Sequence, residues 1–370
     1  MNLLFLIEAL TAGGAERQLV NLMNGLSKKG YKVYLVTWVD KHYFTQLDIP
    51  NVNWSQFSRK GKLDFSLFRL IRSIIRENKI NVVHGFLDTG NLYAWLCTRL
   101  IKGVKVFASE RSSKRKLKGL SRFHKPLIHK LVTKTIANSE AGKLFIQELS
   151  GFKTPVEVIR NGFDNEYFKP VAEFEKVKFR NKHDIDENAL VFINVARIIP
   201  LKRQLEIVIA FSELFISKNA MLILIGQENE LYFKEISDFI INNNLEGKVK
   251  IFPPRAFILE YYQLSDIFIL NSDYEGSPNT LVEAMLCGLV VITTRSGDAA
   301  FYVENTSGNE LIPTKDFHAL KKSMLKLAEL TKSDRYEIGK LNYEHLTKKN
   351  EVSIDSLSNK YEKIYQANEY

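Results

Sequence analysis

The chain has 370 residues, of which 45% are apolar and 25% are charged, and its formal net charge is +10. This composition excludes a disordered or fibrous chain, and the length exceeds one typical hydrophobic core, so we expect two globular domains. The two cysteines exclude a disulfide-rich scaffold and favour a reduced, intracellular protein. No stretch approaches the roughly 20 apolar residues that a membrane-spanning helix requires.

The first segment, "MNLLFLIEAL", is apolar but lacks a basic leader and reaches Glu8 early. We therefore expect a buried strand here and not a signal peptide. Gly13 and Gly14 separate this strand from a helical pattern that closes on Gly30, a residue suited to the C′ position of a helix. Paired glycines let a ligand approach the backbone closely, but this pair lacks the G-x-G-x-x-G pattern of NAD sites.

Short apolar runs alternate with longer amphipathic runs through the first half of the chain. They predict strands at residues 3–7, 32–37, 81–84, 104–108, 135–138 and 156–159. Strands that alternate with helices are typical of a parallel sheet covered on both faces.

A basic stretch, "RSSKRKLKGLSRFHKPLIHKLVTK" at residues 111–134, contains nine Lys and Arg and no acid. Residues 1–170 hold 28 basic and 13 acidic side chains, whereas residues 171–370 hold 24 and 29. The stretch favours an anionic partner such as nucleic acid, anionic lipid or a phosphorylated ligand, and a solvated surface is the alternative. The candidate contacts with an acceptor or a membrane are Arg111, Lys114, Arg115, Lys116, Lys118, Arg122 and Lys125.

A polar, weakly periodic segment at residues 161–188 separates the first series of strands from a second. The second series is predicted at residues 190–195, 221–225, 249–252, 267–270 and 290–293, and the chain ends in an amphipathic helix. We expect an α/β protein with two doubly wound Rossmann-like domains that face a central cleft, where a ligand would bind.

The loop after the strand at 190–195 reads "ARIIPLKRQ" and carries two cations. Arg197 and Lys202 flank a short proline loop between this strand and a helix. Two cations at the carboxyl end of a strand are able to neutralise a diphosphate leaving group without a metal ion. The alternative is a pair of ordinary surface cations.

The segment "SDYEGSPNTLVEAMLCG" follows the strand at 267–270. Ser277 is a plausible N-cap and Pro278 a plausible first helical residue, which directs the N–H groups of residues 279–281 outward. A helix N-terminus at the end of a parallel strand is suited to an anion. Carboxylates beside a diphosphate would instead bind sugar hydroxyls, so Glu275 and Glu283 are candidates for a second sugar and a ribose. The alternative is a well-capped helix without a ligand.

Six motifs support a family resemblance by their order. They are "GGAER" at 13–17, "VVHGF" at 82–86, "NSE" at 138–140, "NGFD" at 161–164, "ARIIPLK" at 196–202 and "EGSPNTLVEAMLCG" at 275–288. With these motifs nearly the whole chain resembles family 4 of the retaining glycosyltransferases, which have the two-domain GT-B fold. The resemblance implies an acceptor-binding domain at 1–165 and a nucleotide-sugar-binding domain at 166–350, with the last helix, about 350–370, packing back on the first domain.

The resemblance also implies roles for single residues. Arg197 and Lys202 would bind the donor diphosphate, Glu275 the transferred sugar and Glu283 the ribose. His84 would lie near the reacting centre and hydrogen-bond a sugar hydroxyl, although a lone histidine is more often structural. The other implied donor contacts are Gly13 and Gly14 near the phosphate, Arg255 and Phe257 near the base, Ser277, Asn279, Thr280 and Leu281 at the helix start, and Asp298 near the sugar.

The resemblance further implies that the nucleotide-sugar is a substrate and that neither cofactor nor metal is needed. The single Asp-x-Asp triplet, at 184–186, lies in the polar segment and is expected to form a turn or cap. A UDP-hexose or UDP-N-acetylhexosamine donor is favoured because such donors are frequent in the family. Many relatives glycosylate lipid-linked acceptors, so we expect assembly of a cell-surface polysaccharide or glycolipid. The protein would be cytoplasmic and peripheral on the inner face of the membrane, held by the basic stretch.

Three other functions remain open at this point. A nucleic-acid-binding protein would use the basic stretch, but the sequence has no recognised helix-turn-helix, zinc-finger or RNP pattern. A nucleotide-sugar epimerase of the same architecture would turn over the donor without an acceptor. A non-catalytic sugar-nucleotide-binding protein would bind the donor without turnover.

Overall fold

The computed structural model describes residues 1–59, 61, 64–111, 117, 119, 121–215, 218–226, 229–254, 258–348 and 352–367. It divides the chain into two compact units. Unit 1 comprises residues 1–163 and the C-terminal segment, and unit 2 comprises residues 164–350. The sequence predicts a boundary at 165/166, and the family resemblance implies that the last helix packs on the first domain.

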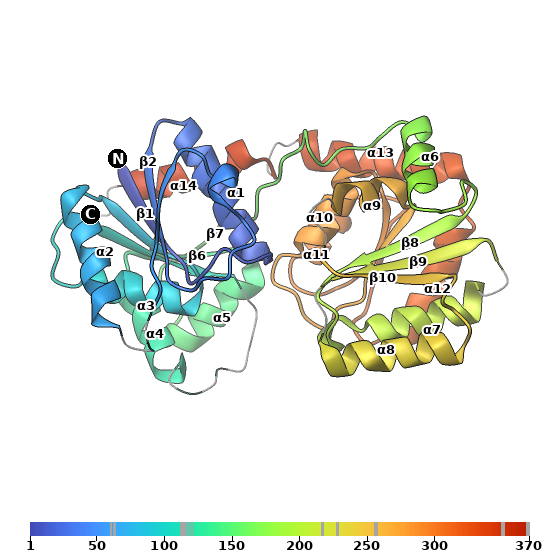
Figure 1. The fold of residues 1–370 in the computed structure, drawn as a ribbon, viewed down its shortest axis with the longest axis horizontal. Coiled ribbons are helices and arrows are strands. Elements are labelled where there is room, and N and C mark those ends of the chain that lie inside the picture. The colour runs from blue at the N-terminus through green and yellow to red at the C-terminus, as the bar shows by residue number, and fades with distance from the viewer. Residues whose placement is uncertain are drawn as a thin grey trace. The chain divides into compact units, whose positions relative to one another are not determined.

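Unit 1 contains a seven-stranded sheet in the order β3-β2-β1-β4-β5-β6-β7, and every pair of neighbouring strands is parallel (Figure 1). The strands are β1 Asn2–Leu6, β2 Lys32–Thr37, β3 Val52–Gln56, β4 Val82–Gly85, β5 Lys105–Glu110, β6 Lys134–Ala137 and β7 Val156–Val158. The helices are α1 Gly14–Lys28, α2 Phe65–Glu77, α3 Leu87–Thr98, α4 Ser121–Leu131, α5 Glu140–Ser150 and α14 Ile354–Gln366, with a 3-10 turn at Gln46–Asp48.

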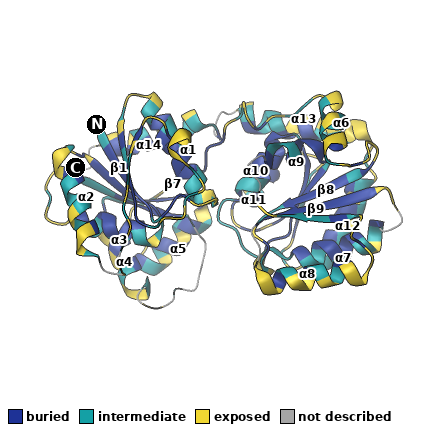
Figure 2. Cartoon of the chain, viewed as in Figure 1, coloured by how far each residue is buried: buried dark blue, intermediate teal, exposed yellow. Residues whose placement is uncertain are grey.

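Both faces of the unit 1 sheet are buried, as β1 illustrates. Leu3 and Phe5 pack toward α1 and α14, whereas Leu4 and Leu6 pack toward α2 and α3. Alternate residues of a strand point to opposite faces, so a strand covered on both sides is apolar throughout. Figure 2 shows this buried sheet between partly exposed helices.

Unit 2 contains a six-stranded sheet in the order β10-β9-β8-β11-β12-β13, which is also parallel throughout. The strands are β8 Leu190–Val195, β9 Ala220–Ile225, β10 Val249–Phe252, β11 Ile267–Leu270, β12 Val290–Thr294 and β13 Glu310–Ile312. The helices are α6 Glu173–Lys182, α7 Gln204–Phe215, α8 Glu230–Asn242, α9 Ile258–Leu264, α10 Asn279–Leu286, α11 Ala299–Val303, α12 Phe317–Ala328 and α13 Lys332–Lys348, with a 3-10 turn at Pro200–Lys202.

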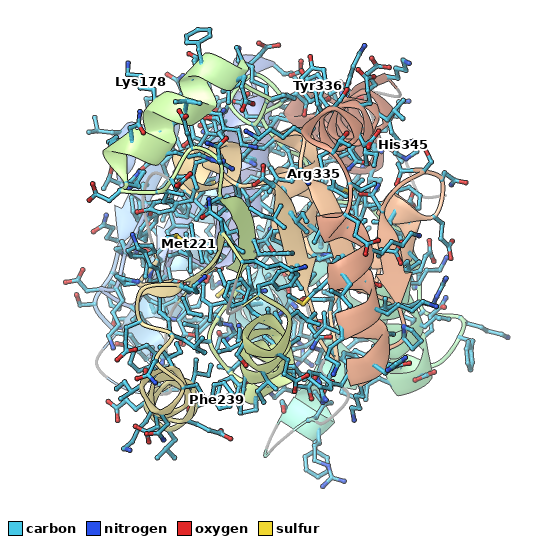
Figure 3. All side chains as sticks on the ribbon, turned by 90° about the vertical axis from the view of Figure 1, so that its right-hand side faces the viewer. Lys178, Met221, Phe239, Arg335, Tyr336 and His345 are labelled. Carbon is cyan, nitrogen blue, oxygen red and sulfur yellow. The ribbon has the colours of Figure 1, made fainter. Side chains whose placement is uncertain are left out.

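Two helical layers cover the sheet of unit 2. Helices α7, α8 and α12 lie on one face, and α6, α9, α10 and α13 lie on the other. Figure 3 shows the layers from the side, with Phe239 of α8 below, Met221 of β9 between the layers, and Lys178 of α6 and Arg335 of α13 above. The predicted fold class of two Rossmann-like α/β domains is therefore confirmed.

Strands β3 and β13 and helix α6 are among the elements that were absent from the sequence predictions. Strand β3 and strand β13 lie at sheet edges. Only the first residue of β3 is buried and β13 has only three residues, so their apolar signal is weak. Helix α6 lies inside the polar segment 161–188, where Arg180 is buried and donates to the carbonyl oxygens of Leu264, Glu187 and Ala189. Partners distant in sequence stabilise this helix, and its own periodicity does not reveal them.

Candidate active site

The strand order of unit 2 reverses between β8 and β11. From β8 the chain proceeds outward to β9 and β10, and later outward in the opposite direction from β11 to β12 and β13. The loops that follow β8 and β11 therefore diverge at the carboxyl edge of the sheet, which is where ligands bind in open α/β sheets. These two loops carry Arg197, Lys202 and Glu275, and α10 begins where the second loop ends.

The loop after β8 has a fixed backbone. The side-chain amide of Gln204 donates to the carbonyl oxygen of Arg197 at 2.9 Å. The backbone N–H of Asn229 donates to the carbonyl oxygen of Ile198 at 3.0 Å. Gly226 packs so closely that a Cβ there would lie 1.8 Å from the Ala196 carbonyl oxygen. The Arg197 side chain is exposed on this rigid support.

Lys202 and Glu275 form an ion pair between the two loops. The Lys202 Nζ lies 2.5 Å from Glu275 Oε1, and the two side chains are only 13% and 12% exposed. The hydroxyl of Ser272 donates to the same carboxylate oxygen at 2.7 Å. The structure thus brings together two of the residues that the sequence assigned to the reacting centre.

Helix α10 begins one residue later than predicted. Pro278 is the N-cap residue and Asn279 the first helical residue, and no side chain caps the helix. The Ser277 hydroxyl instead lies 3.3 Å from the Tyr302 hydroxyl. Thr280 and Leu281 therefore occupy the first turn, where backbone N–H groups lack carbonyl partners within the helix. The positive end of the helix lies beside the Glu275 loop.

The loop after β12 supports the Glu275 loop from the other side. The N–H of Asp298 donates to the Gly276 carbonyl oxygen at 2.9 Å. Gly297 has a φ of +57°, and a Cβ there would lie 2.5 Å from the Glu275 carbonyl oxygen. Glycine is needed at this contact for both reasons. Gly297 was not among the site residues predicted from the sequence, although a glycine in this loop indicates a turn or a close backbone contact.

Glu283 lies in the interior of α10 and is 3% exposed. One of its carboxylate oxygens accepts a hydrogen bond from the Tyr262 hydroxyl at 2.9 Å. Tyr262 therefore helps to fix this carboxylate, and sequence analysis missed it because it lies 21 residues away on α9. The proposed contact of Glu283 with a ribose remains a prediction.

The strand order of unit 1 also reverses, between β1 and β4. Gly13 is the N-cap residue of α1 and Gly14 its first residue, and no side chain caps this helix. A Cβ on Gly13 would lie 2.3 Å from a carboxylate oxygen of Glu16. The glycine pair thus lies at the carboxyl edge of β1, a position suited to a loop that binds phosphate. Its contact with the donor phosphate remains a prediction.

His84 is fully buried beneath this edge. Its Nδ1 lies 2.6 Å from the Tyr365 hydroxyl and its Nε2 lies 2.8 Å from the Ser109 hydroxyl. Burial, with a smaller effect of Arg111, holds the pKa of His84 well below its ordinary value, so the ring is neutral. Because both nitrogens have partners inside unit 1, this arrangement does not present His84 to a sugar hydroxyl as the sequence analysis expected.

Two residues of the basic stretch face the interior of unit 1. Lys125 is 4% exposed and pairs with Glu110 at 2.6 Å and with Asp88 at 3.0 Å. Arg111 donates to Asn161 Oδ1 at 3.1 Å and to the Tyr361 hydroxyl. Neither residue belongs to an exposed basic surface, because each is held by partners within unit 1. These partners lie in other segments of the chain, so the local sequence does not reveal them. Arg122 is exposed.

Six candidates lie outside the described residues. They are Lys114, Arg115, Lys116 and Lys118 of the basic stretch, and Arg255 and Phe257 of the proposed base-binding loop.

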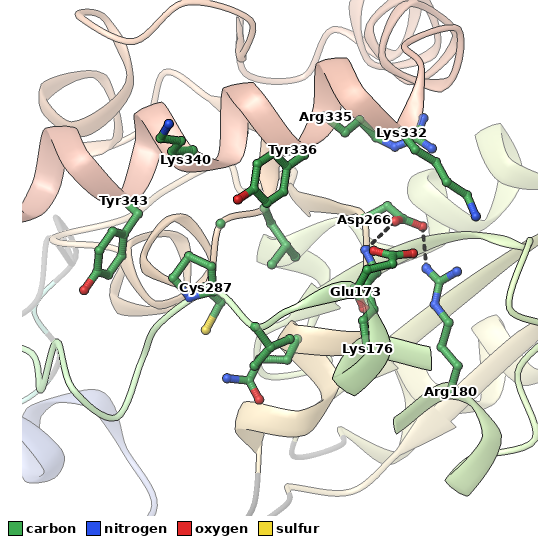
Figure 4. Close-up of a pocket in the computed structure, with 16 residues that line it drawn as sticks. Glu173, Lys176, Arg180, Asp266, Cys287, Lys332, Arg335, Tyr336, Lys340 and Tyr343 are labelled. Atoms are coloured by element: carbon green, nitrogen blue, oxygen red, sulfur yellow. Dashed lines mark hydrogen bonds and ion pairs between the residues drawn. The ribbon is translucent and has the colours of Figure 1, made fainter. Parts of the chain in front are cut away.

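A cavity of about 140 Å³ lies elsewhere in unit 2 (Figure 4). Helix α13 lines it with Arg335, Tyr336 and Lys340, and Asp266 lines it together with its ion-pair partners Lys176 and Arg180. Asp266 immediately precedes β11, so the cavity lies at the amino edge of the sheet. It is separate from the candidate site, which lies at the carboxyl edge.

Within the described ranges, no three His, Cys, Asp or Glu side chains gather closely enough to hold a metal ion. Over the same part of the chain, no helix combines the length and apolarity needed to cross a membrane.

Two family models together match most of the chain. The model described as Glycosyltransferase Family 4 matches residues 12–167, and the model described as Glycosyl transferases group 1 matches residues 175–343. The chain belongs to glycosyltransferase family 4, within the group 1 glycosyltransferases. It is therefore a glycosyltransferase with a GT-B fold.

Individual relatives of this glycosyltransferase are distant. It is 24% identical to the Escherichia coli UDP-Gal:alpha-D-GlcNAc-diphosphoundecaprenol alpha-1,3-galactosyltransferase over 282 residues, covering 71% of this chain and 69% of that protein. It is 23% identical to a Campylobacter jejuni alpha-1,4-N-acetyl-D-galactosaminyltransferase that acts on a diphosphoundecaprenol-linked glycan, over 77% of each chain. Anabaena HepE, solved in complex with UDP, superposes with a TM-score of 0.86 at 19% identity, over 98% of this chain and 99% of that one.

Proposed function

We propose that this glycosyltransferase transfers a hexose or an N-acetylhexosamine from a UDP-sugar to a lipid-linked or glycan acceptor, with retention of the anomeric configuration. The observation that carries the proposal is the convergence of Arg197, Lys202 and the N-terminus of α10 at one sheet edge. All three are suited to a diphosphate. The Escherichia coli and Campylobacter jejuni relatives, whose names specify undecaprenol-linked acceptors, support the acceptor class.

In the proposed reaction the donor diphosphate is the leaving group. The bond between the anomeric carbon and the phosphate oxygen breaks, and the anomeric carbon gains oxocarbenium character. Arg197, Lys202 and the first turn of α10 stabilise the negative charge that develops on the diphosphate. The acceptor hydroxyl bonds to the anomeric carbon from the face that the leaving group vacates, and its proton passes to a diphosphate oxygen. Because cations already neutralise the diphosphate, the reaction requires no metal ion.

Each carboxylate of the site binds hydroxyls in this proposal. Glu275 releases Lys202 and accepts a hydrogen bond from a hydroxyl of the transferred sugar. Glu283 accepts hydrogen bonds from the ribose hydroxyls, while Tyr262 fixes the orientation of the Glu283 carboxylate. A carboxylate accepts two O–H groups, so it suits a vicinal diol. Unit 1 supplies the acceptor side, while Gly13 and Gly14, at the carboxyl edge of β1, approach the phosphate of the donor.

The acceptor class gives helix α4 a role at the membrane surface. Phe123, Leu127 and Leu131 recur every four residues along α4 and are 77%, 48% and 54% exposed. Arg122 and Lys130 on the same helix are also exposed. Exposed apolar side chains flanked by cations favour peripheral binding to an anionic membrane, here the cytoplasmic face.

A donor-release assay tests this function. Purified protein is incubated with a panel of UDP- and GDP-sugars, with EDTA, with and without membrane lipid extract, and free nucleotide diphosphate is measured. Extract-dependent release from one UDP-sugar is the expected result and identifies the donor. Conversion without extract would instead indicate an epimerase, and tight donor binding without turnover in any arm would indicate a binding protein.

A further inference from the structure

Arg203 has an unusual backbone for its residue type. It follows Lys202 directly and has a φ of +52° in the left-handed region. A residue with a Cβ is strained there, and glycine is the residue that adopts this conformation without cost. Strain of this kind persists where surrounding contacts determine it, and it is often found at functional sites. Six other described residues that are not glycine also have a positive φ, so the inference about Arg203 rests on the contacts of its side chain.

The Arg203 side chain binds two carboxylates. Its Nε donates to Glu206 Oε2 at 2.8 Å, a terminal nitrogen donates to Glu206 Oε1, and the other terminal nitrogen lies 3.3 Å from Asp273 Oδ1. The three side chains are 21% to 26% exposed. The pairing with Glu206 is bidentate, a geometry that a planar guanidinium forms and a lysine ammonium does not.

This pairing joins the loops on the two sides of the strand reversal. Arg203 belongs to the loop after β8, whereas Asp273 belongs to the loop after β11. The N–H of Asp273 donates to the Leu201 carbonyl oxygen at 3.0 Å, and the amide of Asn271 donates to Glu206 Oε2 at 3.1 Å. Leu201 precedes Lys202 and Asp273 lies two residues before Glu275, so the network borders the Lys202–Glu275 pair.

We propose that Arg203 is a positioning residue, which sets the separation of Lys202 and Glu275 when the donor is bound. The inference rests on the proposed function of this site. In the structure the Lys202 Nζ and the Glu275 carboxylate lie 2.5 Å apart. A donor diphosphate that binds Lys202 competes with this contact, so another link must keep the two loops in register. The Arg203 network is that link, because its members lie outside the proposed ligand contacts.

The test compares Arg203→Gly, Arg203→Lys and wild-type enzyme in donor turnover and thermal unfolding. Arg203→Gly removes the backbone strain and the guanidinium together, so we expect an unchanged or higher Tm with kcat/KM for the donor lowered about 10- to 100-fold. Arg203→Lys keeps the charge but not the bidentate geometry, so it is not expected to restore kcat/KM. In a Lys202→Ala background, Arg203→Gly is expected to cause no further loss.

Lys315→Gly is the matched control. Lys315 is exposed, has a φ of +64° and lies outside the site, so this variant is expected to gain stability without a change in turnover. The inference is overturned if Arg203→Gly keeps kcat/KM within twofold of wild type, or if its effect persists in full in the Lys202→Ala background. If Lys202→Ala and Glu275→Gln also keep full turnover, the proposed site itself is wrong, which distinguishes the two failures.

Discussion

At the scale of single residues, the pairing of Lys202 with Glu275 determines how the site responds to a donor. The Glu275 carboxylate pairs with Lys202, which is the cation that binds the donor diphosphate in the proposed function. The donor diphosphate must therefore displace the Glu275 carboxylate from Lys202. The free energy lost with that ion pair lowers the affinity of the protein for the donor. The exchange also leaves Glu275 available for a sugar hydroxyl.

Substitution of Glu275 is expected to separate binding from turnover. In Glu275→Gln, Lys202 loses its internal counter-ion, so UDP should bind severalfold more tightly, while loss of the sugar contact should lower turnover about 100-fold. Isothermal titration with UDP and a turnover assay measure the two effects. Glu304→Gln, which removes an exposed partner of Arg295, is the control. Weaker UDP binding by Glu275→Gln would show that the pair does not compete with the diphosphate.

His129 predicts a loss of stability in mild acid. Burial, and then the nearby charge of Lys125, lowers the pKa of His129 to about 3. The unfolded chain binds a proton at the ordinary pKa of about 6.5, so the contribution of this residue to stability is complete above that pH and is lost as the pH falls toward 3. Between pH 7.5 and pH 5 the loss amounts to about 2 kcal/mol.

Urea unfolding at several pH values measures this loss. The wild-type protein should lose about 2 kcal/mol more than His129→Gln over that interval, whereas His318→Gln, which removes an exposed histidine, should behave as wild type. Identical pH profiles for wild type and His129→Gln would show that His129 is not held neutral in the fold.

At the scale of elements, the C-terminal helix α14 is part of the core of unit 1. Leu357, Tyr361 and Tyr365 are buried there, and a Cβ on Gly162 would lie 2.7 Å from the Leu357 Cβ. Leu357→Ala should therefore lower the free energy of unfolding by about 2–5 kcal/mol. Lys363→Ala, at an exposed position of the same helix, should change it little. Equal stability of the two variants in urea unfolding would contradict this packing.

Helix α4 is expected to bind anionic membranes through its exposed apolar residues. Combined replacement of Phe123, Leu127 and Leu131 by serine should reduce flotation with anionic liposomes about tenfold or more at low salt, because it removes most of the apolar contact. Leu100→Ser, at an 89% exposed leucine outside α4, is the control. Unchanged flotation of the triple variant would exclude α4 as the contact.

At the scale of the whole molecule, local patterns predicted the fold well because both sheets are parallel and buried. Most central strands are largely apolar and most connections return through a helix, so the strands of both series were recognisable. The edge strands β3 and β13 were not, because their apolar signal is weak. The polar helix α6 was not, because partners distant in sequence stabilise it.

The same distinction applies to the candidate site. The two loops of unit 2 were predictable because a strand, a loop and a helix start occur together in sequence at Arg197–Lys202 and Glu275–Leu281. The burial of His84 and Lys125 was not predictable, because it depends on Tyr365 and Glu110 from distant segments. Arg203 was also missed, since neither its left-handed backbone nor its contact with Asp273 leaves a local pattern.

The central claim is that Arg197 and Lys202 stabilise the departing diphosphate of a nucleotide-sugar. Turnover of the donor identified in the release assay, compared among wild type, Arg197→Ala and Lys202→Ala in the presence of EDTA, tests it most directly. We expect kcat to fall about 100- to 1,000-fold in each variant while Tm stays near the wild-type value. Full turnover in either variant would show that the leaving group is stabilised elsewhere.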